Sequence, residues 1–352
     1  MKKILDTLYV AAPEVMKVDD EHIVISFDDE EVWREPIEGL EAIYYFGYHS
    51  IRPKLMNVCA EHNVRISIFH PDGQLMSNIT SGESDDGLRL IQKQHYLADG
   101  TQAQLMIARH IIGAKIFNSR WLIGRIHYQY QDQIDLSYIK KTQKILKDML
   151  DETMKVKSME PLYDFRKRAS AETYATFGDL ILREKDFFWF KGRSTKLPMN
   201  PVNILLSLAY GLVQEKCEAA VHALGLDPYK GFFHIDKPDR KSLVLDLLEE
   251  FKAAFADRFI IELINEGKVS SSDFTTDDIG SPILTEAGMA SILEHWQDFC
   301  DETTLHTFVE EDIEWGLLPF TSATLLAKFL KDKVDKYPPF FRQDPPSKRG
   351  KR

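Results

Sequence analysis

The first eighty residues alternate between short apolar runs and polar turns, a pattern typical of β-strands. The runs are rich in β-branched and aromatic residues and occupy positions 8–10, 22–27, 42–46, 64–69 and 74–76. Between two of them, residues 51–60 carry apolar side chains at helical spacing. This part of the sequence predicts a small β-rich region with one helix.

From residue 86 onward, apolar positions recur at intervals of three and four, which is typical of helices. The pattern predicts helices over residues 87–118, 134–153, 169–190, 200–224 and 242–266. A polar stretch at 81–87 is the expected boundary between the β-rich region and the helical region. The prediction is therefore an α+β protein. It has a β-rich domain over 1–85, an all-helical domain over 86–344 and a basic disordered tail over 345–352.

Composition narrows the class of protein. The chain has 352 residues, of which 44% are hydrophobic, enough to form a core and to exclude general disorder. It lacks a run of about 18 apolar residues, which argues against a membrane span. Its three cysteines lie far apart and indicate neither a disulfide framework nor a zinc cage. We expect a soluble, cytoplasmic protein.

The charge is unevenly distributed along the chain. A net charge of -11 argues against binding nucleic acid through bulk positive charge. Residues 101–147, however, hold eight basic and two acidic residues, a net charge of +6. This basic block fits either a solvated helical face or a stripe that follows phosphates, and the sequence leaves both open.

The predicted helix at 242–266 offers candidate chemistry. Apolar residues surround most of the circumference of its first turns, and Asp246 and Glu249 lie among them, three residues apart on one face. Buried carboxylates need cations, hydrogen bonds or protons. A bound divalent metal is one interpretation, and a narrow exposed stripe is the other.

Two further residues are candidate ligands for the same ion. His234 follows the run Gly231-Phe232-Phe233, where a hydrogen-bonded core histidine is also common. Glu172 follows the basic run 166–168 at the expected start of a helix, where a glutamate also complements the helix dipole. Two carboxylates and an imidazole would suit Mg²⁺ or Mn²⁺ better than structural zinc. No Walker loop, GxSxG, HExxH or Rossmann motif offers a competing chemistry.

A set of motifs follows in a fixed order. They are Phe190-Lys191-Gly192-Arg193, Asn200-Pro201-Val202-Asn203, Gly225-Leu226-Asp227-Pro228, Gly231-Phe232-Phe233-His234, Arg240-Lys241-Ser242-Leu243 and Asp246-Leu247-Leu248-Glu249-Glu250-Phe251. This set resembles the CRISPR-associated integrase of spacer acquisition, the metal-dependent DNA endonuclease of the adaptation step. The C-terminal motifs Leu325-Leu326-Ala327-Lys328 and Tyr337-Pro338-Pro339-Phe340 resemble the form found in type I-C systems.

The resemblance implies a set of functional residues. It places the metal ligands on Glu172, His234 and Glu249, with Asp246 as a further catalytic acid beside Mg²⁺ or Mn²⁺. It also implies candidates for contact with DNA or for support of the site, namely Arg166, Arg168, Arg193, Asn203, Tyr210 and Arg240.

The resemblance further implies partners and an architecture. The N-terminal β-rich domain would form a homodimer, and the helical domain would be catalytic. Two dimers would be bridged by a dimer of a small ferredoxin-like CRISPR adaptation subunit, in the cytoplasm of a prokaryote. The DNA partners would be double-stranded fragments and CRISPR repeat DNA. Two alternatives stay open: a non-catalytic DNA-binding scaffold of the same fold, and a stand-alone metal-dependent nuclease of DNA repair.

Overall fold

The computed structural model describes residues 1–11, 15–28, 30–80, 86–100, 102–130, 132–134, 136–194, 200–278 and 280–343. These residues form two compact units, each described by itself below. The first unit is Met1–Gln94 with Glu218–Asp227, and the second is His95–Cys217 with Pro228–Arg352. The dividing line falls inside a helix, later in the chain than the polar stretch at 81–87. The tail predicted over 345–352 lies outside the described residues.

The first unit is built on two sheets. The five-stranded sheet has the order β1-β2-β6-β7-β8, in which β2, β6 and β7 run parallel. These strands are β1 (Lys2–Ile4), β2 (Thr7–Ala11), β6 (Ala42–Phe46), β7 (Arg65–Phe69) and β8 (Leu75–Ile79). The antiparallel three-stranded sheet contains β3 (Val15–Asp19), β4 (His22–Phe27) and β5 (Glu30–Pro36). Helix α1 (Pro53–Glu61) connects the parallel strands β6 and β7, as a parallel pair requires.

The core of this unit confirms the strands and the helix predicted from the sequence. Inward residues of the strands, such as Leu8, Ile43 and Ile66, pack in one cluster with Leu55 and Cys59 of α1. Strand β5 was not predicted, because its sequence is dominated by charged residues that the sheet leaves exposed.

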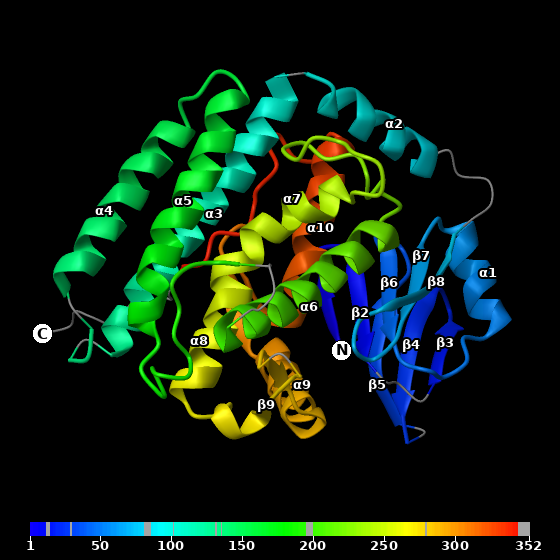
Figure 1. The fold of residues 1–352 in the computed structure, drawn as a ribbon. Coiled ribbons are helices and arrows are strands. Elements are labelled where there is room, and N and C mark those ends of the chain that lie inside the picture. The colour runs from blue at the N-terminus through cyan, green and yellow to red at the C-terminus, as the bar shows by residue number, and fades with distance from the viewer. Residues whose placement is uncertain are drawn as a thin grey trace, which may run out of the picture. The chain divides into compact units, whose positions relative to one another are not determined.

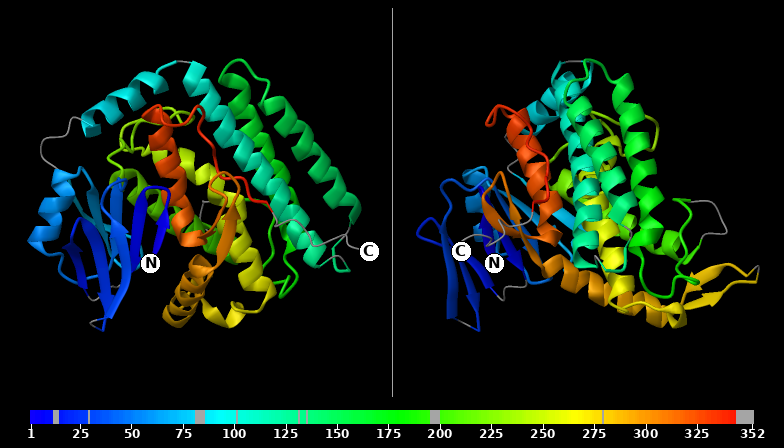
Figure 2. Two further views of the ribbon diagram at one scale, coloured as in Figure 1. Left: turned by 180° about the vertical axis from the view of Figure 1, so that it is seen from behind. Right: turned by 90° about the vertical axis from the view of Figure 1, so that its left-hand side faces the viewer.

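The second unit is mostly helical, which confirms the α+β class. It contains the C-terminal end of α2 (Asp86–Ala98), most of α6 (Pro201–Ala223), and then α3 (Gln102–Gln129), α4 (Leu136–Thr153), α5 (Glu160–Leu180), α7 (Ser242–Phe251), α8 (Arg258–Asn265), α9 (Glu286–Asp301) and α10 (Leu318–Leu330). Helices α3, α4 and α5 lie side by side (Figures 1 and 2). Two short hairpins complete it, formed by β9 (Phe274–Thr276) with β10 (Pro282–Leu284) and by β11 (Thr303–His306) with β12 (Glu311–Glu314).

Three of the predicted helices differ in their bounds. The single helix expected at 87–118 is two helices, α2 and α3, and the one expected at 169–190 runs from Glu160 to Leu180 instead. The helix expected at 242–266 is interrupted by a π-helical stretch, Lys252–Asp257, between α7 and α8. Wider helical turns of this kind occur often at functional sites.

The end of the described chain is tied to the centre of the second unit. The Asn118 side-chain amide in α3 donates to the backbone carbonyls of Glu250, at 2.8 Å, and Phe340, at 2.9 Å. The buried Glu250 carboxylate accepts from the Phe340 amide, at 2.9 Å, and from the Tyr337 hydroxyl. These bonds fix α3 against α7, the two helices that carry charged residues of the candidate site. None of the described helices has both the length and the apolar character needed to cross a bilayer.

Candidate active site

The histidine loop is held by one buried carboxylate. Asp246, which is fully buried on α7, accepts hydrogen bonds from the backbone amides of Phe232, Phe233 and His234 at 2.6, 2.9 and 2.9 Å. Its Oδ1 also lies 2.7 Å from Nδ1 of His234. Because the carboxylate only accepts, Nδ1 donates the proton of this bond, and Nε2 is the ring nitrogen left to face a ligand. Asp246 therefore fixes the position and the tautomer of His234.

The close approach of this loop to α7 requires a glycine. A Cβ on Gly231 would lie 2.9 Å from Oδ2 of Asp246 and 2.9 Å from Cβ of Ser242. Any side chain at this position would push the loop away from the carboxylate. The glycine of the Gly-Phe-Phe-His motif is therefore required for the histidine loop to pack against α7.

Three cations surround the carboxylate of Glu249. Nζ of Lys115 lies 2.7 Å from Oε2, and Oε1 accepts from Nε of Arg166 at 2.9 Å and Nζ of Lys252 at 2.8 Å. Glu249 is fully buried. Burial opposes its ionisation most strongly, yet the charges of Lys115, Lys252 and Arg166 together hold the pKa of Glu249 well below its usual range. Glu249 is therefore an anion, as a metal ligand must be.

His234 and Glu249 face each other. Nε2 of His234 lies 3.8 Å from Oε1 of Glu249, a separation that two ligands of one ion can have. A neutral imidazole nitrogen and a carboxylate oxygen suit Mn²⁺ and are compatible with Mg²⁺. The exposed-stripe interpretation of Asp246 and Glu249 is wrong, because both side chains are fully buried.

Glu172 is not placed with this pair. It is half-buried in the interior of α5, so the interpretation as a first-turn glutamate is wrong. Among the described residues, no group of three or more His, Cys, Asp or Glu side chains is arranged to hold a metal. The geometry brings together two of the three ligands that the resemblance implies.

Tyr210 belongs to a buried hydrogen-bonded chain. Its hydroxyl donates to Oδ1 of Asp257 at 2.5 Å and lies 2.8 Å from the hydroxyl of Tyr174. Burial raises the pKa of Asp257 to about 6, although Tyr210, Lys115 and Lys252 lower it in part. The Tyr210 hydroxyl thus makes hydrogen bonds inside the protein, to Asp257 and Tyr174.

Arg193 and Asn203 form a second supporting network. The Asn203 side chain accepts from Nη1 of Arg193 at 3.1 Å and donates to the carbonyl of Gly192 at 3.0 Å. Nη2 of Arg193 donates to Oγ of Ser207 at 2.9 Å, and its guanidinium carbon lies 5.3 Å from the centre of the Tyr210 ring. These contacts secure the start of α6 against the preceding loop.

The basic block does not form one stripe. Lys115 is only 5% exposed and points to Glu249, so it fits neither a solvated helical face nor a stripe that follows phosphates. The Arg109 side chain is bound to backbone carbonyls. On α4, by contrast, Lys140, Lys144 and Lys147 are exposed at helical spacing and share one face. Elsewhere, Arg168 is exposed and pairs with Asp164 at 3.4 Å, and Arg240 is half-buried in the loop before α7.

With this geometry described, similarity to known proteins can be stated. Residues 8–298 match the family model described as CRISPR associated protein Cas1. The chain belongs to this family. It is 30% identical over 341 residues to CRISPR-associated endonuclease Cas1 1 of Chlorobaculum tepidum, covering 97% of this chain and 99% of that protein. It is 31% identical over 346 residues to CRISPR-associated endonuclease Cas1 2 of Rhodospirillum rubrum, covering 97% and 99%.

Solved structures share the fold. A casposase bound to integration product superposes with a TM-score of 0.75 at 21% identity, covering 96% of this chain and 100% of that one. The Cas1 protein TM1797 from Thermotoga maritima gives 0.72 at 20% identity, covering 94% and 98%. The match to the Cas1 family confirms the resemblance proposed from the ordered motifs, whereas the type I-C form stays a prediction.

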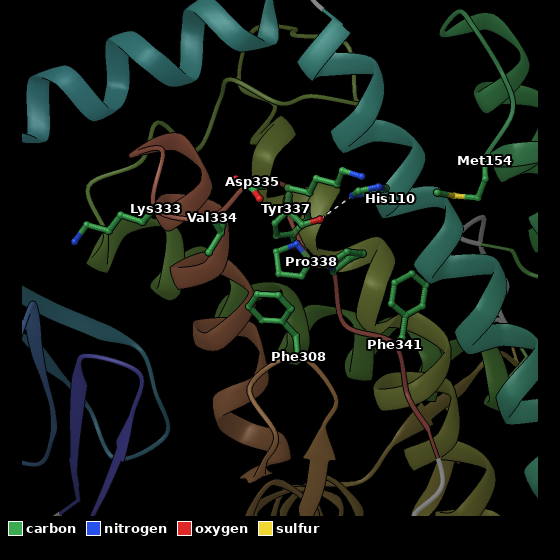
Figure 3. A pocket seen from close by; sticks show the side chains of 11 residues that line it. His110, Met154, Phe308, Lys333, Val334, Asp335, Tyr337, Pro338 and Phe341 are labelled. Carbon is green, nitrogen blue, oxygen red and sulfur yellow. Dashed lines mark hydrogen bonds between the residues drawn. The ribbon is translucent and has the colours of Figure 1, made fainter.

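Two of the pockets lined by described residues of the second unit bear on the question of ligand access to the site. One, of about 370 Å³, is lined by residues that include His234, Phe233, Tyr163 and Lys230, and so opens beside the candidate site. The other, of about 700 Å³, lies between His110, Met154, Phe308 and the segment 333–341, and contains none of the predicted site residues (Figure 3). Of the two, only the smaller pocket gives a ligand access to His234.

Sequence reasoning selected Arg166 as a candidate DNA contact but did not place Lys115 and Lys252 at Glu249. Lys252 had a signal, because it stands three residues after Glu249 on the same face. Lys115 had none, since it is 134 residues away in the chain and comes close only when α3 packs against α7.

Proposed function

We propose that this chain is a metal-dependent DNA endonuclease and integrase of CRISPR adaptation. It would insert short DNA fragments into a CRISPR array when a 3′-hydroxyl attacks a phosphodiester of the repeat. The observation that carries the proposal is the separation of 3.8 Å between Nε2 of His234 and Oε1 of Glu249, with the histidine tautomer set by Asp246. Membership of the Cas1 family supports it, as do relatives named as endonucleases.

Mg²⁺ or Mn²⁺ is the proposed cofactor, held by His234 and Glu249, with Glu172 as the proposed third ligand. When bound, such an ion supplies Lewis-acid polarisation of the scissile phosphate and charge stabilisation for the attacking hydroxyl. Asp246 would act as a positioning residue, since its oxygens already accept four hydrogen bonds. Orientation of a ligating imidazole by a carboxylate is a common device in metal sites.

Basic side chains of this protein would bind the phosphates of the DNA. Arg166, Arg168 and Arg240 are the proposed phosphate contacts, together with the exposed lysines of α4. Such contacts give binding that weakens steeply as the salt concentration rises. Arg193, Asn203 and Tyr210 are proposed to support the site rather than to touch DNA, because their polar groups bond to one another and to Asp257.

The partners follow from the family. We propose a homodimer formed through the β-rich region and a complex with a small ferredoxin-like adaptation subunit, in the cytoplasm of a prokaryote. Solved neighbours described as Cas6-RT-Cas1–Cas2 complexes, with TM-scores of 0.73 and 0.60, share the fold, and their descriptions name a protein partner for this family. The DNA partners would be double-stranded fragments and CRISPR repeat DNA.

A stand-alone DNA-repair nuclease and a non-catalytic scaffold are the alternatives. Joining of a labelled fragment to a repeat-containing duplex distinguishes them, with matched random-sequence duplex as the control. We expect joining that needs Mn²⁺ or Mg²⁺, stops with EDTA and prefers the repeat. Cleavage without joining would favour the repair nuclease, and DNA binding with neither reaction would favour the scaffold.

A further inference from the structure

One arginine covers the oxygen that a shared metal would need. Nε of Arg166 donates to Oε1 of Glu249 at 2.9 Å, and Oε1 is the oxygen that faces Nε2 of His234. An ion bound by both residues would have to lie beside Oε1. The existing hydrogen bonds of that oxygen therefore stand in the way of the ion.

The three cations on Glu249 differ in their freedom to leave. The side chains of Lys115 and Lys252 are 6% and 16% exposed, whereas that of Arg166 is 38% exposed. Lys115 also holds the other oxygen, Oε2. Moving a lysine ammonium out of a buried pair leaves charge without compensation, whereas a half-exposed guanidinium is rehydrated as it leaves, so that its departure costs less. Arg166 is thus the cation best placed to move.

We infer that Arg166 is a movable counter-ion that occupies Oε1 of Glu249 in the metal-free protein and gives way when a divalent metal binds. This inference rests on the proposed function, because it takes His234 and Glu249 as metal ligands. Displacement relieves the repulsion between the guanidinium and the incoming ion. Displacement also frees the guanidinium of Arg166, whose paired N–H donors match the spacing of the oxygens of a phosphodiester.

The consequence is coupling between metal and DNA. A phosphate that holds the released guanidinium makes Oε1 more accessible to the metal, so each ligand strengthens the binding of the other. Thermodynamic linkage requires the coupling to be equal in both directions. The structure thus assigns Arg166 a role in making metal occupancy depend on bound DNA.

The test is Mn²⁺ binding measured by electron paramagnetic resonance on the full-length protein, with and without a short DNA duplex. The variant is Arg166→Gln. Arg183→Gln is the matched control, since Arg183 is an exposed arginine shortly after the same helix and the net charge changes equally. Arg166→Lys adds a variant that keeps the charge. Circular dichroism confirms that each variant is folded.

Without DNA, we expect Arg166→Gln to bind Mn²⁺ about tenfold more tightly than the wild type, the effect of one charged hydrogen bond. Arg183→Gln should not change the affinity, and Arg166→Lys should stay nearer the wild type. DNA should strengthen Mn²⁺ binding in the wild type and have little effect in Arg166→Gln.

Two results would overturn the inference while leaving the proposed function intact. One is a wild type that binds Mn²⁺ with the same affinity as Arg166→Gln, and the other is an equal strengthening by DNA in both proteins. If neither protein binds Mn²⁺ under any of these conditions, both the inference and the proposed metal site are wrong.

Discussion

Nδ1 of His234 lies 2.7 Å from Oδ1 of Asp246, on a carboxylate that also accepts three backbone amides of the histidine loop. The two residues therefore act as one unit: the acid builds the loop and at the same time selects the nitrogen that the histidine offers to a ligand. Glu249, one turn further along α7, supplies the oxygen that faces that nitrogen.

Asp246→Asn should weaken catalysis through His234. An amide has one accepting oxygen, so it cannot replace a carboxylate that accepts four hydrogen bonds, and the histidine loses its fixed tautomer. We expect Mn²⁺ affinity and DNA cleavage to fall about ten- to a hundredfold. This is the usual effect of removing a carboxylate that accepts a hydrogen bond from a metal-binding histidine. Asp239→Asn is the control, because Asp239 is exposed and has a φ of 57°, which asparagine tolerates. Equal activities of the two variants would contradict the positioning role.

Tyr210→Phe should destabilise the protein more than it weakens DNA binding. Removing the hydroxyl leaves the buried Asp257 without its donor, which costs about 1–3 kcal/mol. Urea denaturation at pH 7 measures this loss, and fluorescence anisotropy with a duplex measures affinity. Tyr174→Phe is the companion variant and should lose less stability, since Tyr210 still donates to Asp257. A large loss of affinity with unchanged stability would make Tyr210 a DNA contact.

Acid should destabilise the protein through His306. Burial lowers its pKa to about 4, from 6.5 in an unfolded chain. Between these two values the unfolded chain takes up a proton that the folded protein does not bind, so stability is full above pH 6.5 and falls as the pH drops toward 4. Over that range the loss is about 3 kcal/mol. Urea denaturation at pH 5 and pH 7 should show a smaller difference for His306→Gln than for the wild type, and an equal difference would refute this assignment.

The exposed lysine face of α4 should set the salt dependence of DNA binding. Replacing Lys140, Lys144 and Lys147 together by Gln should lower affinity uniformly across sequences and reduce the slope of log K against log salt by about 3. Anisotropy titrations between low and moderate salt give the slope. The triple variant Lys155→Gln/Lys157→Gln/Lys185→Gln changes the charge equally at other exposed positions and should keep the wild-type slope. Equal slopes for both triple variants would exclude this face from the interface.

Much of the fold could be predicted from the sequence, because many of its strands and helices have a recognisable local pattern of apolar residues. The short run 42–46, which is apolar throughout, predicted a strand, and apolar residues around most of the circumference near Asp246 predicted a buried helix. The charged strand β5 was not predicted because most of its residues are charged and exposed, and Trp33 is its one aromatic residue that packs against the core. The break in the helix expected at 87–118 did have a local signal, Asp99-Gly100, which was overlooked; Gly100 has a φ of 73° and ends α2 before α3 begins at Gln102.

The candidate site was predictable only in part. His234, Asp246 and Glu249 were selected because polar residues in an apolar setting need a reason to be there. Their roles depend on contacts that the spacing of residues along the sequence does not show. The carboxylate of Asp246 accepts three backbone amides, and Lys115 contacts Glu249 from another helix. Long-range packing therefore decided which carboxylate faces His234 and which one positions it.

The most direct test of this account is strand joining by His234→Ala. With Mn²⁺ present, the wild type should join a 3′-hydroxyl fragment to a repeat-containing duplex. His234→Ala should bind the same duplex, remain folded and join nothing, while His222→Ala, a histidine on α6, joins at the wild-type rate. Joining by His234→Ala at the wild-type rate would contradict the assignment of the site.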